Sequence, residues 1–260
     1  MIHVHNDFRE APLCDLREVE LNLLWTLLYE LKDKGLEDLM AHGRADISIP
    51  IENIIESSNY NKTRKFVEKD FEIIADIITS YKIPITDGEY KGKVVPFPIV
   101  KTDKNKTNLT VTVLVEFAYI VNYIFAQANF TKLSLVEMNG LNGKPAKIAY
   151  YHMSTYSDTG VWHMDKNSLY KIFGIPKSYT PRDIRRRIIA PIIQECGKHF
   201  GEIKYYEREG QKHSIEAVMF VFEPRNVKDF IRSDVKRNSQ LEQLKENWID
   251  KTATVKGEES

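Results

Sequence analysis

The sequence predicts an α+β protein, and three patterns in its C-terminal half support this prediction. Between residues 184 and 196, apolar residues recur about every four positions, as on one face of a helix. A shorter helical pattern at residues 167–175 ends at a glycine. Two β-prone runs, residues 202–208 and 214–222, flank a turn that contains glycine, which is typical of a hairpin. Helix, turn, helix and hairpin in this order predict a winged helix-turn-helix, whose second helix would enter a DNA major groove.

The second helix of this pattern has a well-marked beginning. Thr180 can accept hydrogen bonds from free N–H groups, Pro181 suits the first helical position, and Asp183 complements the helix dipole. Pro191 lacks an N–H group, so we expect a kink there. Arg185 falls near the apolar side by its helical phase, so we expect it to reach out from the helix end or to find a partner.

The same region is basic, although the whole chain has a formal net charge of zero. Residues 171–215 contain ten Lys and Arg against five Asp and Glu. A local basic face on a neutral protein is typical of phosphate binding, and arginine can bind guanine O6 and N7 with two hydrogen bonds. We therefore predict DNA contacts from Lys177, Thr180, Arg182, Arg185, Arg186, Arg187, Lys204, Arg208 and Lys212.

The arginine run taken alone would also fit a solvated helix face with salt bridges to Glu195 or Glu202. The hairpin and the preceding helix favour the DNA interpretation, because together they complete the winged pattern. Tyr205 and Tyr206 are neighbours on a predicted strand, so we expect one of them to pack the hairpin against the core.

The run YKIFGIPKSYTPRDIRRRIIAPIIQECGKHFGEIKYYEREGQKHSIEAVMFVFEP resembles a known family. A short helix ends in Phe-Gly-Ile, an Arg-Arg-Arg-aliphatic helix carries a Glu in its second half, and a Lys-Tyr hairpin closes on an aliphatic-Phe-aliphatic-Phe strand. These parts resemble the C-terminal winged helix of the Rep initiators of theta-replicating, iteron-type plasmids. The resemblance implies two tandem winged-helix domains and a non-enzymatic initiator without a cofactor. Pro191 departs from the family pattern.

The N-terminal half repeats the order of parts but not the residues. Two helical patterns and a third with a basic beginning at residues 61–78 precede β-prone runs at residues 93–100 and 108–115. We therefore predict another winged helix at roughly residues 8–127. Residues 1–60 contain five Lys and Arg against twelve Asp and Glu, so we do not expect this face to lie on DNA. The candidate phosphate contacts in this half are Lys62, Arg64 and Lys65.

The remaining boundaries follow from these two domains. We expect a linker at residues 128–145, the C-terminal winged helix at 146–224, a helical segment at 225–250 and a disordered tail at 251–260. The resemblance implies that the first winged helix makes a dimer contact. The apolar strand near residues 109–115 would be a reasonable pairing surface.

The resemblance also implies the partners. Monomers would bind directly repeated iterons in double-stranded DNA and recruit the host replication initiator and helicase. Homodimers, in equilibrium with monomers, would bind an inverted operator and repress the protein's own gene. The second interpretation is a winged-helix transcriptional repressor without origin function.

Composition argues against several other classes of protein. No apolar run reaches the roughly 18 residues that span a bilayer, and the N-terminus lacks the features of a secretion signal. Cys14 and Cys196 have no CxxC spacing, so we expect reduced thiols in the cytoplasm. No Gly-rich phosphate-binding motif is present.

A rolling-circle nickase is a remote alternative. His3 and His5 have the spacing of its metal ligands, and Tyr29 stands three residues before Lys32, as a tyrosine nucleophile would. We disfavour it because we expect no strand at the N-terminus and expect Tyr29 to lie in a core helix. The other histidines lack metal-ligand spacing, so we predict no metal site.

Overall fold

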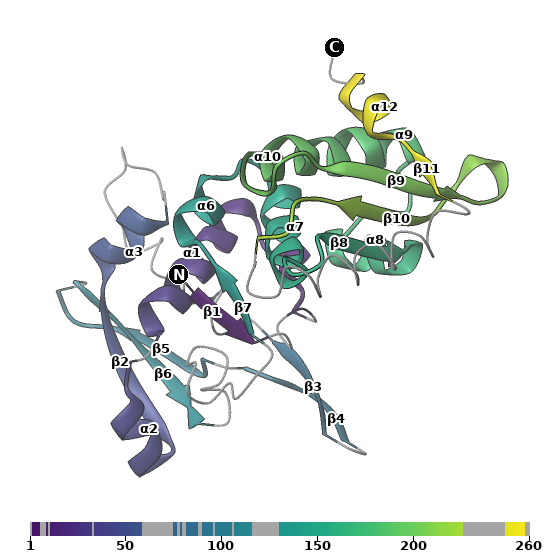
Figure 1. Cartoon of the computed structure of the whole chain (residues 1–260). Coiled ribbons are helices and arrows are strands. Elements are labelled where there is room, and N and C mark those ends of the chain that lie inside the picture. Colours follow the sequence, from purple (N-terminus) through teal and green to yellow (C-terminus); the bar gives the residue numbers. More distant parts are fainter. Residues whose placement is uncertain are drawn as a thin grey trace. The chain divides into compact units, whose positions relative to one another are not determined.

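A computed structural model describes residues 2–5, 9, 11–32, 34–58, 75–76, 79, 82–87, 90–95, 97–105, 107–115, 130–225 and 248–257. The chain divides into two compact units (Figure 1). The first comprises Met1–Pro12 and Leu16–Gly140, and the second comprises Leu13–Asp15 and Leu141–Ser260.

The second unit begins with a buried helix, a strand and a short helix. These are α7 (Lys144–Thr155), β8 (Val161–Asp165) and α8 (Lys166–Phe173). The Asp165 carboxylate caps α8 by accepting a backbone N–H at 2.7 Å. Gly174 ends α8 in the left-handed conformation, with φ of 61°, which confirms the predicted end of this helix.

One long helix follows, and its middle turn is wider than an α-helix. Its parts are α9 (Pro181–Ile184), the π-helical turn η5 (Arg185–Ile189) and α10 (Ala190–Phe200), and we call residues 181–200 the arginine helix. The predicted apolar face is confirmed, because one set of its side chains is buried: Ile184, Ile188, Ile189, Ile192, Ile193, Cys196 and Phe200.

Antiparallel strands complete the second unit. β9 (Lys204–Glu209) and β10 (Ile215–Val221) form the predicted hairpin, which we call the wing. β8 pairs with the other edge of β10, and β11 (Ile249–Asp250) pairs with the other edge of β9. The strand order is therefore β11-β9-β10-β8 (Figure 1). Aromatic rings fill the core between this sheet and the helices: Trp162, Phe173, Phe200, Tyr205, Phe220 and Phe222.

A short piece of the N-terminal chain belongs to the second unit. The 3-10 turn η2 (Leu13–Asp15) lies against α7 and α8. The Lys144 ammonium donates to the Cys14 carbonyl at 2.8 Å, and the Cys14 thiol lies 3.3 Å from the Lys171 carbonyl. A Cβ at Gly174 would lie 3.1 Å from the Cys14 Cβ, so this glycine also serves close packing.

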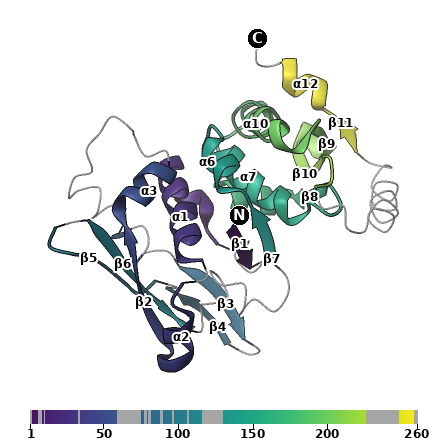
Figure 2. The ribbon, with the colours of Figure 1, turned by 60° about the vertical axis from the view of Figure 1, so that its left-hand side comes forward.

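The first unit holds small antiparallel sheets and helices (Figure 2). Its strands are β1 (Ile2–His5) with β7 (Phe130–Leu133), β3 (Ile83–Asp87) with β4 (Tyr90–Val94), and β2 (Arg44–Pro50) with β6 (Asn108–Leu114) and β5 (Ile99–Thr102). Its helices include α1 (Glu18–Leu31), α2 (Leu36–His42), α3 (Ile51–Ser57) and α6 (Leu135–Gly140). The strand predicted at residues 108–115 is confirmed as β6, whereas the helix predicted at 61–78 lies almost wholly outside the described residues.

Several expected boundaries differ from the structure. The expected linker at residues 128–145 contains β7 and α6, whose apolar side chains, including Leu133 and Met138, are buried. β6 is paired on both edges, by β2 and β5, so its backbone has no edge left for strand pairing with a second copy. The expected disordered tail contains a helix, α12 (Thr252–Gly257), because Val255 is buried in the second unit.

Two glycines give a matched test of this fold. We expect Gly174→Ala to lower the free energy of unfolding by about 1 kcal/mol or more, because alanine is strained at this positive φ and meets Cys14. Gly197→Ala, within α10, should instead raise it by up to about 1 kcal/mol, because a Cβ there meets nothing within 4 Å. Urea unfolding midpoints would check both, and equal effects of the same sign would contradict the assignment.

Candidate nucleic-acid interface

The beginning of the arginine helix is fixed by a reciprocal cap. The Thr180 hydroxyl accepts the Asp183 N–H at 3.2 Å, and the Asp183 carboxylate accepts the Thr180 N–H at 3.1 Å and its hydroxyl at 2.7 Å. The hydrogen bond from Thr180 lowers the pKa of Asp183, so the carboxylate is ionised at neutral pH. The cap predicted from the sequence is confirmed.

Arg182, Arg186 and Arg187 lie on the exposed side of this beginning. The side chains of Arg186 and Arg187 are 54% and 52% exposed, and their guanidinium groups lie 3.8 and 3.6 Å from the Asp183 carboxylate. Arg187 also lies over the Tyr179 ring, 5.2 Å from its centroid. Exposed ion pairs of this kind are weak, since water screens them, so both arginines can exchange Asp183 for a phosphate or a base edge.

Arg185 has a different environment from its two neighbours. Its Nε and Nη2 donate to the Glu207 carboxylate of β9 at 2.8 and 2.7 Å, a bidentate pair. The Glu207 side chain is fully buried, and that of Arg185 is 15% exposed. The Tyr205 hydroxyl donates to the same carboxylate at 2.7 Å, and burial raises the pKa of Tyr205 well above its usual value. Arg185 thus has the partner that we expected from its position near the apolar side of the helix, and its guanidinium group faces β9.

A π-helical turn begins at Arg185 and ends at Ile189. The Ala190 N–H donates to the Arg185 carbonyl, five residues back, instead of four. Pro191 stands in the first turn of α10 and can make no such bond. We expected a kink at Pro191, and the distortion lies just before it, in η5, where the wider turn keeps the helix continuous. A proline near the middle of a long helical pattern was the available sequence signal for this feature.

The wing presents basic side chains on the outward side of β9. Lys204 and Arg208 are exposed, whereas Tyr205 between them is buried and Tyr206 half-buried, as the predicted alternation requires. Arg208 lies 3.8 Å from Glu216 and 5.9 Å from the centroid of the Trp248 ring. The remaining candidates are Lys177, exposed before the arginine helix, and Lys212, in the wing turn, whose side chain lies outside the described residues.

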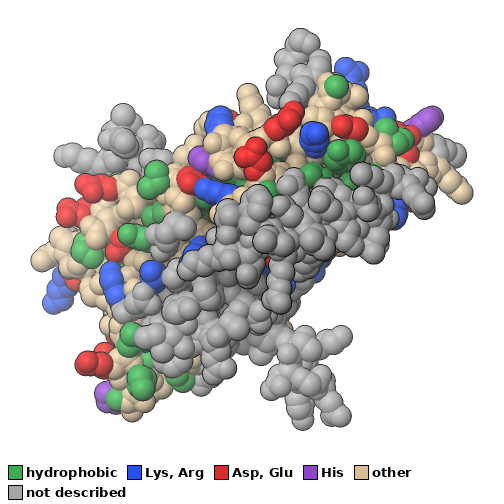
Figure 3. Space-filling view, viewed as in Figure 1, with side chains coloured by type: hydrophobic (Ala, Val, Ile, Leu, Met, Phe, Trp, Pro, Cys, Tyr) green, Lys and Arg blue, Asp and Glu red, His purple; other side chains and the backbone are tan. Residues whose placement is uncertain are grey.

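Acidic and basic side chains are interspersed on the face of the second unit shown in Figure 3, around α10, α12 and β9. Net charge alone therefore does not define the interface, and each candidate has to be judged by its own exposure and partners. In the first unit, Lys62, Arg64 and Lys65 lie outside the described residues.

The structure gives little support to the remote alternative, a rolling-circle nickase. His3 and His5 do lie on a strand, β1, so our expectation of no strand at the N-terminus was wrong. Tyr29 lies in the largely buried helix α1, as expected, although it is itself 40% exposed. Within the described ranges, however, no group of three His, Cys, Asp or Glu side chains could hold a metal ion. Over the same ranges, no helix is both long and apolar enough to cross a membrane.

Removing the Glu207 carboxylate should be costly, because Arg185 would then be a buried charge without its main partner. We expect Glu207→Ala to lower the free energy of unfolding by about 3 kcal/mol, against about 0.5 kcal/mol or less for the exposed Glu216→Ala. The double variant Arg185→Met, Glu207→Leu should recover much of the loss, because no unpaired charge remains. Urea denaturation would measure all three, and similar losses for Glu207→Ala and Glu216→Ala would contradict a structural role for the pair.

Comparisons with known proteins agree with this architecture. The family described as "Initiator Replication protein, WH1" matches residues 1–154, and that described as "Initiator Rep protein, WH2" matches residues 166–222. A "Probable replication protein rep" of Bifidobacterium longum is 29% identical over 234 residues, which cover 85% of this chain and 72% of that protein. The crystal structure of the Pi initiator protein in complex with iteron DNA has a TM-score of 0.64 at 12% identity, over 86% of this chain and 97% of that chain.

These findings confirm the predicted fold class, an α+β chain with two tandem winged helices. They also confirm the resemblance inferred from the arginine helix and the wing. Because the two family matches together span most of the sequence, the chain belongs to the family of winged-helix replication initiator proteins.

Proposed function

We propose that the second unit binds double-stranded DNA by placing the first turns of the arginine helix in the major groove. The supporting observation is the set of exposed guanidinium groups, Arg182, Arg186 and Arg187, at a helix end fixed by the Thr180 cap. Helix-turn-helix proteins contact base edges from the beginning of the second helix. Arginine suits this position because its fork can pair with guanine O6 and N7.

The other candidates divide by role in this proposal. Lys177 and Thr180 lie at the approach to the helix and contact the phosphate backbone there. Lys204, Arg208 and Lys212 on the wing contact phosphates to the side. Arg185 positions the helix by its bond to Glu207 and does not reach DNA. Lys62, Arg64 and Lys65 make auxiliary phosphate contacts from the first unit.

The DNA is a set of directly repeated iterons at a replication origin. The basis is the match to the initiator family, together with the similarity in fold to the Pi initiator protein, which was crystallised in complex with iteron DNA. Monomers bind the iterons, help to open the duplex without enzymatic chemistry, and recruit the host initiator and helicase. Dimers bind an inverted operator and repress the gene.

Binding to the DNA that flanks the gene tests the interface. We expect Arg186→Ala and Arg187→Ala each to weaken specific binding by about 1–3 kcal/mol. Lys204→Ala should weaken binding to all DNA sequences and lower the salt slope, the slope of log affinity against log salt concentration, by about 1. Lys34→Ala, an equal charge change in the first unit, is the control and should leave both quantities unchanged. Gel shifts at several salt concentrations, with footprinting, would measure them. Unchanged footprints after Arg186 and Arg187 are both replaced would refute this interface.

A replication assay separates the initiator from a repressor without origin function. We expect a plasmid without its own replicon to replicate when it carries this gene and the repeats upstream of it. The same plasmid with Arg186→Ala and Arg187→Ala in the gene is the control and should be lost. If the unaltered plasmid is also lost while the protein still binds and represses, the repressor interpretation holds instead.

A further inference from the structure

The C-terminal residues 248–257 add a strand and a helix to the second unit, beyond the family match that ends at residue 222. β11 pairs with β9, with Ile249 opposite Glu207 and Asp250 opposite Tyr206. The wing strand β9 is therefore an interior strand, held by β10 on one side and by β11 on the other. We call residues 248–257 the C-terminal clasp.

The clasp is bonded to β9 at several points. The Tyr205 N–H donates to the Thr252 hydroxyl at 2.8 Å, and the Lys251 N–H donates to the Tyr205 carbonyl at 2.9 Å. The Lys251 ammonium lies 2.9 Å from the Glu209 carboxylate, and this contact lowers the pKa of Glu209. The backbone groups of Tyr205 on this side of β9 are thus satisfied by the clasp, and Tyr205 is the residue whose hydroxyl binds Glu207.

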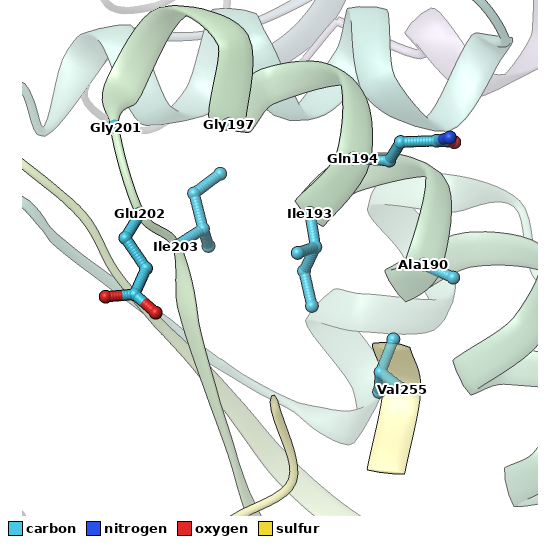
Figure 4. A pocket seen from close by; sticks show the side chains of 8 residues that line it. All are labelled: Ala190, Ile193, Gln194, Gly197, Gly201, Glu202, Ile203 and Val255. Carbon is cyan, nitrogen blue, oxygen red and sulfur yellow. The ribbon is translucent and has the colours of Figure 1, made fainter. Parts of the chain in front are cut away.

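The clasp also reaches the arginine helix. α12 lies against η5 and β9. Its Val255 side chain is 1% exposed and helps to line a cavity of about 430 Å³ together with Ala190, Ile193, Gly197 and Ile203 (Figure 4). Ala190, Ile193 and Gly197 lie on α10, which continues the helix directly after the turn that bears Arg186. The clasp therefore packs on the same helix that bears the exposed arginines, one turn further along.

We propose that the C-terminal clasp is a positioning element of the DNA-binding unit, which holds the wing and the arginine helix in one fixed relation. β9 carries Glu207, which binds Arg185 at the π-helical turn, so a shift of β9 is transmitted to the turn that bears Arg186 and Arg187. Lys251 is engaged by Glu209 and Val255 is buried, so these two residues act through β9 and the helix. This inference rests on the proposed DNA binding by the second unit.

Point variants of the full chain test the clasp, with the DNA that flanks the gene as probe. Val255→Asp should weaken binding at least about tenfold, and Thr252→Val should weaken it by roughly tenfold, the equivalent of one hydrogen bond. Thr254→Asp introduces the same charge at an exposed neighbouring position and is the matched control, with unchanged binding. Thr252→Ser keeps the hydroxyl and should restore the affinity lost in Thr252→Val.

Two further readouts distinguish positioning from a loss of folding. The slope of log affinity against log salt concentration should fall by about 1 for each wing phosphate contact that is lost. In footprinting, the DNA contacted by the wing should lose its protection before the DNA contacted by the arginine helix. Both are measured on Thr252→Val at a temperature where circular dichroism shows it folded. Unchanged affinity and salt slope would overturn the proposal. Tighter binding after Val255→Asp or Thr252→Val would also overturn it, because α12 would then inhibit DNA binding. If the unaltered chain fails to bind, the proposed function itself fails.

Discussion

The buried Glu207 carboxylate is the point at which the arginine helix and the wing are joined. It accepts both arms of Arg185 from the helix and the hydroxyl of Tyr205 from its own strand. A charge taken fully out of water is tolerated only when its hydrogen-bonding capacity is met, so these partners cannot be removed singly without cost. A helix that contacts base edges needs a fixed angle to the element that contacts the DNA backbone. The cluster of Arg185, Tyr205 and Glu207 fixes that angle between the arginine helix and the wing.

The different directions of the three arginines make this junction compatible with DNA contact. Three consecutive arginines on a helix point about 100° apart, so they cannot all face one surface. Helical phase directs Arg185 toward β9, where it binds Glu207, and leaves Arg186 and Arg187 exposed beside Asp183. One arginine thus stabilises the unit while two remain available to a ligand. On the other side of β9, the C-terminal clasp prevents the wing strand from being a free edge.

Much of the second unit could be predicted from local sequence signals. The Thr180–Asp183 cap, the end of α8 at Gly174 and the hairpin around Gly210 each depend on residues a few positions apart. The predictions that differed concern distant partners. β6 has the alternation of a strand, but nothing in its own residues indicates that β2 and β5 cover both edges. Residues 252–257 form a short segment with little local helical signal, and Val255 packs in the cavity beside the arginine helix.

The sequence by itself determined the α+β class, the tandem order of elements, the start of the arginine helix and the excess of basic residues around it. These follow from helical period, strand alternation and capping, which act within one or two turns of chain. Only the tertiary structure decided which arginine is used internally, because Arg185 and Glu207 are 22 residues apart and Tyr205 and Thr252 are 47 apart. Contacts at such separations depend on how the elements pack, and a charged residue in a strand carries no local sign of the partner that will neutralise it.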